Sequence, residues 1–133
     1  MTSALELRHV SKVYGSGPAE VHALSVVDLS VEGGELVAVM GPSGSGKSTL
    51  LTIAGSLEEP TSGQVLVDGV DLGTASRADR ARMRRRSIGY VFQDFNLLPG
   101  LTAAENVALP LELDGLTAGE ALAAGLRALE ELG

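Results

Sequence analysis

A glycine- and serine-rich stretch at residues 41–49 constrains this chain more than any other feature of its sequence. It follows an apolar run at residues 36–40 and precedes a run of helical character at residues 48–54. A strand, a glycine-rich turn and a helix form the setting in which the pattern G-x-x-x-x-G-K-[ST] binds phosphate. The stretch, called the phosphate loop below, consists of Gly41, Pro42, Ser43, Gly44, Ser45, Gly46, Lys47, Ser48 and Thr49.

The expected chemistry of the phosphate loop follows from its backbone. Glycines allow the backbone to approach an anion closely, and the helix N-terminus supplies unpaired N–H groups and the positive end of its dipole. We expect Lys47 to reach the β- and γ-phosphates and the Ser48 hydroxyl to bind Mg²⁺. The alternative is a flexible turn with an incidental lysine, which the flanking strand and helix patterns disfavour.

Composition limits the class of protein. The 133 residues suffice for one domain with a core, and 44% of them are hydrophobic, as in folded globular proteins. The absence of cysteine excludes disulfides and thiolate metal sites. No apolar run has the length of a membrane span and the first residues lack the apolar core of a signal peptide, so we expect a cytoplasmic protein. A net charge of −7 argues against a nucleic-acid partner.

Basic residues are nevertheless concentrated in one segment. Six of the ten lysines and arginines lie within residues 77–86. A solvated helix face is the simpler interpretation of this segment, and binding to phosphates or to a protein partner is the alternative.

The first third of the chain predicts an antiparallel β-ribbon. Residues 5–10 alternate imperfectly between apolar and polar side chains, and residues 21–31 form a second extended segment. Between them lies a turn-rich loop at residues 11–18, which carries Tyr14. The ribbon leads into a buried strand expected at residues 35–40.

The middle of the chain predicts a hairpin, a helix and a further strand. Residues 64–69 read as a short strand that ends in an Asp-Gly turn, and residues 70–72 continue it across a hairpin. A helix is expected over residues 76–86, with Ser76 as its cap. The apolar residues 88–92 predict another buried strand.

Two helices are expected near the end of the chain. Each begins with the pattern Thr-x-x-Glu, which is typical of a capping box. Pro110 is expected to interrupt or kink the first of them. The two predicted boxes are formed by Thr102 with Glu105 and by Thr117 with Glu120.

Four segments in this order resemble the nucleotide-binding subunits of ATP-binding-cassette (ABC) transporters: the Tyr14 loop, the phosphate loop, residues 57–65 and residues 88–93. Residues 95–107 resemble most the lipoprotein-releasing, macrolide-exporting and cell-division ATPases of that family. The resemblance implies an α/β fold, with a P-loop NTPase core, an N-terminal antiparallel β-ribbon and an incomplete helical subdomain. It covers residues 1–133 as the N-terminal part of an ATP-binding domain, divided into residues 1–92 and 93–133.

The resemblance also implies ATP and Mg²⁺ as cofactors. Tyr14 would stack on the adenine; its alternative role is that of a packed ribbon tyrosine. Gln93 would meet Mg²⁺ and the attacking water, so that Ser48 and Gln93 are the expected metal ligands and Lys47 and Gln93 the expected catalytic residues. The alternative for Gln93 is an ordinary strand-end glutamine.

Two protein partners are implied by the same resemblance. Residues 93–101, with Phe95, Leu97 and Leu98, would dock on an integral-membrane permease; the alternative is local packing against the following helix. A second ATP-binding subunit would pair head to tail with the complete protein. The chain would then lie at the inner face of the cell membrane, held by its permease.

Parts of the family pattern are missing from this sequence. Nothing resembles the Leu-Ser-Gly-Gly-Gln signature, the Walker B strand ending in Asp-Glu or the switch histidine, and His9 and His22 are expected to be ordinary residues. We therefore expect the N-terminal part of a motor subunit that binds nucleotide but does not hydrolyse it efficiently. The alternatives are a truncated, non-catalytic product that binds nucleotide weakly, or another P-loop class such as a nucleotide kinase or a small GTPase.

Overall fold

The computed structural model describes residues 3–133 and divides into two compact units. The first unit ends at Ser87 and the second begins at Ile88. The division that we predicted from the sequence lies after residue 92. The two units are described separately below.

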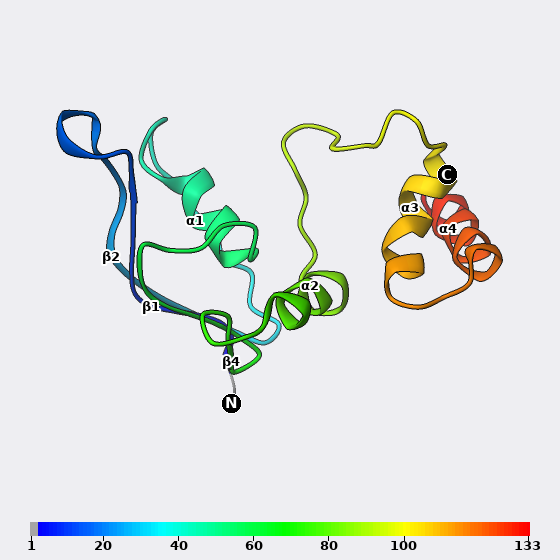
Figure 1. Ribbon diagram of the computed structural model, residues 1–133, viewed down its shortest axis with the longest axis horizontal. Coiled ribbons are helices and arrows are strands. Elements are labelled where there is room, and N and C mark those ends of the chain that lie inside the picture. The colour runs from blue at the N-terminus through cyan, green and yellow to red at the C-terminus, as the bar shows by residue number, and fades with distance from the viewer. Residues whose placement is uncertain (1–2) are drawn as a thin grey trace. The chain divides into compact units, whose positions relative to one another are not determined.

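The first unit is built on a four-stranded antiparallel sheet with the order β2-β1-β3-β4 (Figure 1). The predicted ribbon and the predicted hairpin are both confirmed. β1 continues through Tyr14, so the loop predicted from residue 11 onward is wrong in its first half. The strands are β1 (Ser3–Tyr14), β2 (Val21–Glu32), β3 (Ser62–Val67) and β4 (Val70–Asp71).

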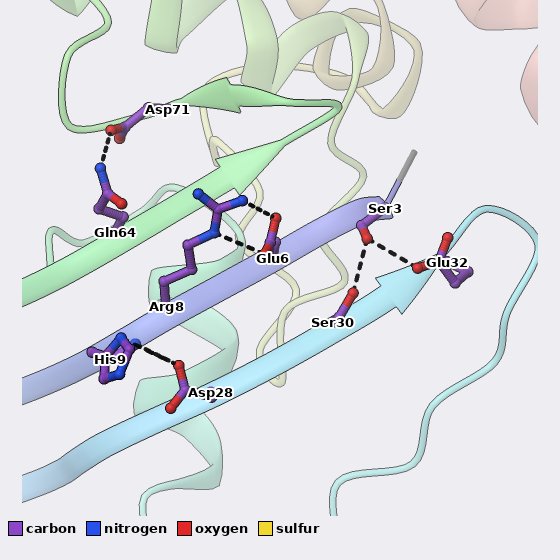
Figure 2. Close-up of polar contacts among 9 residues, drawn as sticks. All are labelled: Ser3, Glu6, Arg8, His9, Asp28, Ser30, Glu32, Gln64 and Asp71. Carbon is purple, nitrogen blue, oxygen red and sulfur yellow. Dashed lines mark hydrogen bonds and ion pairs between the residues drawn. The ribbon is translucent and has the colours of Figure 1, made fainter. Parts of the chain in front are cut away.

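A bulge in β1 explains its imperfect alternation. Leu7 and Val10 are both buried although they are three residues apart, an odd spacing that places side chains on opposite faces of a regular strand. The pairing with β2 shifts register between these two residues, and His9 has a φ of +51°. The His9 N–H donates to Oδ1 of Asp28 at 2.8 Å, which satisfies the backbone group that the bulge frees (Figure 2). The bulge therefore turns both apolar side chains toward the core.

Polar side chains link neighbouring positions of this sheet (Figure 2). Ser3 of β1 hydrogen-bonds both Ser30 and Glu32 of β2, which ties the outer ends of the ribbon together. Similar contacts join Arg8 to Glu6 within β1 and Gln64 of β3 to Asp71 of β4.

One helix covers the sheet of the first unit. α1 (Lys47–Ala54) contacts β1 and β2 and buries Ile53 among the apolar residues of the strands. α2 (Arg77–Arg86) buries none of its residues. Its predicted cap is confirmed, because the Ser76 side chain accepts a hydrogen bond from the Asp79 N–H at 3.1 Å. The core of this unit comprises Leu7, Val10, Leu24, Ile53, Val65, Val67 and Leu72.

The two buried strands predicted at residues 35–40 and 88–92 are wrong for this structure. Both segments lack strand pairing within residues 3–133, and Leu36 and Val91 are each 97% exposed. A strand needs a neighbour that satisfies its backbone N–H and C=O groups. No other described segment pairs with these two as a strand.

The second unit is a pair of helices, α3 (Ala103–Leu113) and α4 (Ala118–Leu132), and both predicted capping boxes are present. Pro110 lies inside α3, which continues to Leu113, so of the two predicted effects the interruption is wrong and the kink stays a prediction. Within residues 3–133, no helix is both long enough and apolar enough to span a bilayer.

Small residues allow α3 and α4 to pack closely side by side (Figure 1). Ala108 of α3 and Ala121 of α4 are fully buried. A Cβ atom added to Gly125 would lie only 2.9 Å from the Ala104 carbonyl oxygen. The close approach of the two backbones therefore requires glycine at this position.

The capping boxes predict an acid-sensitive second unit. Glu105 accepts from the Thr102 N–H at 2.7 Å and Glu120 from the Thr117 N–H at 3.1 Å, and these bonds hold the pKa of each carboxyl group below its ordinary value of 4.5. A group whose pKa is lowered by folding stabilises the fold above its unfolded pKa, and this effect is lost as the pH falls through the folded pKa. We expect circular dichroism to show helix loss below about pH 4.5.

The control is the double variant Glu105→Gln with Glu120→Gln. Glutamine makes the same box at every pH, because it does not titrate. The double variant should lose less helix on acidification than the original chain. Identical acid transitions in the two proteins would contradict this role of the boxes.

Candidate functional site

The phosphate loop leads directly into α1. Gly46 is the N-cap of the helix, with a φ of +93° and no capping side chain, and its carbonyl accepts the Leu50 N–H at 2.9 Å. Within the loop, the Ser45 N–H donates to the Pro42 carbonyl at 3.2 Å. The first N–H groups of α1 have no partner within the helix, and the positive end of the helix dipole lies beside them.

Lys47 folds back over the loop. Its ammonium group donates to the carbonyl oxygens of Gly41 at 2.6 Å and Pro42 at 2.7 Å, and Oγ of Ser45 lies at 3.4 Å. A positive charge is thus held over the loop by neutral carbonyl groups. Phosphate oxygens make stronger, charge-assisted bonds with an ammonium group than carbonyls do.

A hollow of about 560 Å³ brings most of the predicted residues together. This volume is within the usual range for a small-molecule site. Three of its lining residues, at the start of β2, were not predicted from the sequence. One of them is His22, which was expected to be an ordinary residue. Its Nε2 atom lies 2.6 Å from Oε1 of Glu20. The hollow is lined by Tyr14, Val21, His22, Ala23, Ser43, Gly44, Gly46, Lys47, Ser48 and Thr49.

Tyr14 is held in place by two residues that the sequence did not single out. Its hydroxyl donates to Oε2 of Glu58 at 2.7 Å, and Nζ of Lys12 lies 3.0 Å from Oε1 of Glu58. The bond to Glu58 raises the pKa of Tyr14, whereas that bond and Lys12 lower the pKa of Glu58. Glu58 lies in the segment 57–65 that carries the family resemblance, which was the only signal in the sequence for it.

The donor atoms at the loop are compatible with a hard metal ion. Ser48 is the second residue of α1, lines the hollow and offers a hydroxyl oxygen, the ligand type that Mg²⁺ prefers. In the described part of the chain, no group of three His, Asp or Glu residues is placed to hold a metal. An ion at Ser48 would take further oxygen ligands from phosphate and water. Gln93, the other predicted ligand, lies exposed in the second unit.

Two arginines of α2, which the sequence predicted to lie on a solvated helix face, contact the segment that follows α1. Arg80 forms an ion pair with Glu59, and Arg84 donates to the Ser56 carbonyl at 3.0 Å. Both arginines line a second hollow of about 440 Å³, which also includes Ile53 of α1. These contacts attach α2 to the segment that follows α1.

The family model described as ABC transporter matches residues 24–133. The chain belongs to the ABC transporter family. It is 47% identical over 129 residues to the lipoprotein-releasing system ATP-binding protein LolD of Shewanella frigidimarina, covering 97% of this chain and 54% of LolD. It is 45% identical to the macrolide export ATP-binding/permease protein MacB of Marinobacter nauticus, covering 97% of this chain and 20% of MacB. The chain thus spans about half the length of LolD.

A solved ABC structure has the same fold. It is a dimeric ATP-binding cassette in a post-hydrolysis state, bound to ADP and phosphate, and it matches with a TM-score of 0.85 and 42% sequence identity. The match covers 95% of this chain and 56% of that cassette. The α/β fold class with a P-loop core, predicted from the ABC resemblance, is therefore confirmed.

Gly46 predicts a steric test of the loop. A Cβ atom at Gly46 would lie 2.3 Å from the Ala23 carbonyl oxygen, whereas one at Gly44, which also has a positive φ, would meet no atom within 4 Å. Both changes to alanine incur about 1–2 kcal/mol of backbone strain. We expect Gly46→Ala to lose a further 1–3 kcal/mol or so through overpacking, as measured by thermal unfolding. Equal destabilisation by the two variants would show that the contact with β2 does not constrain the loop.

Proposed function

We propose that this chain binds Mg-ATP and is the ATP-binding part of an ABC-type motor subunit that drives export through a separate permease. The observation that supports it best is the hollow where Tyr14 faces the same space as Lys47 and Ser48. An aromatic ring and a phosphate loop on one hollow match the two ends of a nucleotide. Membership of the ABC family makes ATP the nucleotide to test first.

The proposed binding mode uses the groups already in place. The β- and γ-phosphates occupy the N-terminus of α1, where unpaired N–H groups and the helix dipole favour negative charge. The Lys47 ammonium exchanges the Gly41 and Pro42 carbonyls for phosphate oxygens. Ser48 offers its hydroxyl to Mg²⁺, which neutralises part of the phosphate charge, and Gln93 would add a second ligand.

For this chain alone, the proposal is binding rather than efficient hydrolysis. Phosphoryl transfer to water requires a phosphate site, a metal clamp and a residue that orients the water. Lys47 belongs to the phosphate site and Ser48 would supply part of the metal clamp. No Walker B or signature segment occurs in the sequence. A non-catalytic product that binds nucleotide weakly is the alternative. Multiple turnovers of phosphate release by this chain would contradict both the proposal and this alternative.

The first functional prediction concerns Lys47. Lys47→Ala removes the one lysine or arginine that lines the hollow among the described residues, and charge-assisted bonds contribute about 1.5–3 kcal/mol each. We expect ATP to bind at least about tenfold more weakly to the variant in isothermal titration calorimetry.

Arg127→Ala is the matched control, because it also removes one positive charge, from an exposed position on α4. ATP affinity should be unchanged in this variant. If Lys47→Ala binds ATP as the original chain does, the loop is not a phosphate site.

The proposed permease contact lies at residues 93–101. Phe95 is 93% exposed, and Leu97 and Leu98 are also exposed. The Asn106 side chain shapes this segment, because Oδ1 accepts the Leu98 N–H at 2.8 Å while Nδ2 donates to the Leu98 and Leu101 carbonyls at 3.2 Å. An apolar surface presented by a fixed backbone is suited to docking a protein partner. The complete protein would dock there at the inner membrane face and pair with a second ATP-binding subunit.

Phe95→Asp combined with Leu98→Asp tests this contact. Charges in place of exposed apolar anchors should lower recovery of the cognate permease in a pull-down about tenfold or more, while ATP affinity stays unchanged. The control, Leu113→Asp with Leu132→Asp, changes two other exposed leucines. Undiminished recovery of the first variant, or equal loss in both, would count against docking through this segment.

A further inference from the structure

The end of β1 is fastened to the segment that follows α1 by backbone as well as side-chain bonds. The Val13 N–H donates to Oγ1 of Thr61 at 2.9 Å, and the Thr61 N–H donates to the Ser11 carbonyl at 2.9 Å. Lys12 adds a bond from its ammonium group to the Glu59 carbonyl at 2.7 Å. These contacts hold residues 11–14 and 58–61 side by side.

Both oxygens of the Glu58 carboxylate are used within this arrangement. Oε2 accepts the Tyr14 hydroxyl at 2.7 Å, and Oε1 lies 3.0 Å from Nζ of Lys12. The side chain of Lys12 is only 15% exposed and that of Glu58 33% exposed, so this ion pair is less screened by water than a pair on the open surface. Nζ of Lys12 also lies over the Tyr14 ring, 5.1 Å from its centroid.

We infer that Glu58 is a positioning residue for nucleobase binding: together with Lys12 it fixes the Tyr14 ring, and the base stacks on the ring face opposite Lys12. The inference rests on the proposed function, since it concerns the base end of the same hollow. It assigns to Glu58 and Lys12 a role that acts entirely through Tyr14.

Two physical consequences follow from a fixed ring. A ring that is already oriented loses little conformational freedom when a base stacks on it, so the hydroxyl bond to Glu58 strengthens binding without touching the ligand. The Glu58 carboxylate binds Tyr14 and Lys12, so the inference assigns it no contact with the base. Stacking itself tolerates any base. ATP and GTP should therefore bind within about tenfold of each other.

The test compares two ligands on the 133-residue chain: Mg-ATP, which has a base, and Mg-tripolyphosphate, which has none. Glu58→Ala should weaken ATP about twofold to tenfold and leave tripolyphosphate unchanged. Glu59→Ala is the matched control, because this neighbouring carboxylate pairs with Arg80 instead of Tyr14. It should alter neither affinity. In a Tyr14→Ala background, Glu58→Ala should have no further effect on ATP.

Each other outcome overturns the inference. Equal weakening of both ligands would make Glu58 a support of the phosphate loop, and unchanged ATP affinity would remove its role. If the original chain binds tripolyphosphate as tightly as ATP, the base contributes no stacking and the inference fails, whereas the proposed phosphate site is retained. If it binds neither, the proposed function fails and the inference fails with it.

Tyr14→Phe keeps the experiment decisive if Glu58→Ala does not fold. It retains the ring but removes the hydroxyl, so it should weaken ATP binding about as much as Glu58→Ala does and leave tripolyphosphate binding unchanged.

A second measurement follows the ionisation of Tyr14 directly. Tyr14 is the only tyrosine in a Tyr90→Phe chain, so the ultraviolet absorbance of that chain reports the ionisation of Tyr14. The Tyr14 pKa, raised above 10.0 by the bond to Glu58, should fall in Glu58→Gln. An unchanged titration would show that Glu58 does not hold the ring in solution.

Discussion

The first unit depends on β1 being hydrogen-bonded along both of its edges. β2 pairs with one edge and β3 with the other, and the bulge at His9 turns Leu7 and Val10 to the same face of the sheet. α1 packs through Ile53 into the core that these residues share. A strand with two partners has little freedom to move, so its last residue, Tyr14, reaches the phosphate loop in a fixed position.

The loop itself is held from one side only. The segment before it, residues 35–40, is exposed, and within residues 3–133 it pairs with no strand. Burying it unpaired would be unfavourable, because each unpaired backbone group costs about 1–3 kcal/mol and each residue has two, while a buried Val or Leu contributes about 1.5–3 kcal/mol. The position of the loop is therefore set by its other end, through α1 and the close contact of Gly46 with Ala23 of β2.

The elements that the sequence predicted correctly are those with local causes. The three helix caps at Ser76, Thr102 and Thr117 depend on residues three apart, and the β3–β4 hairpin depends on its own turn. Six residues of the phosphate loop line one hollow with Tyr14, and the role of the loop in phosphate binding stays a prediction from its spacing.

The predictions that failed depend on distant residues. The apolar character of residues 35–40 and 88–92 indicates a strand, but pairing needs a partner that periodicity does not reveal. The approach of Glu58 to Tyr14 joins residues 44 positions apart, and Arg80 meets Glu59 across 21 positions. A charged residue in a sequence looks the same whether it is solvated or paired, so the run of arginines gave no sign of these contacts.

The segment that follows α1, residues 56–59, contacts β1 on one side and α2 on the other. Glu58 faces Lys12 and Tyr14 of β1, whereas Glu59 pairs with Arg80 of α2. Arg84 of α2 also bonds the Ser56 carbonyl, directly beyond the last turn of α1. Residues 56–59 therefore join the end of α1 both to the support of Tyr14 and to the attachment of α2.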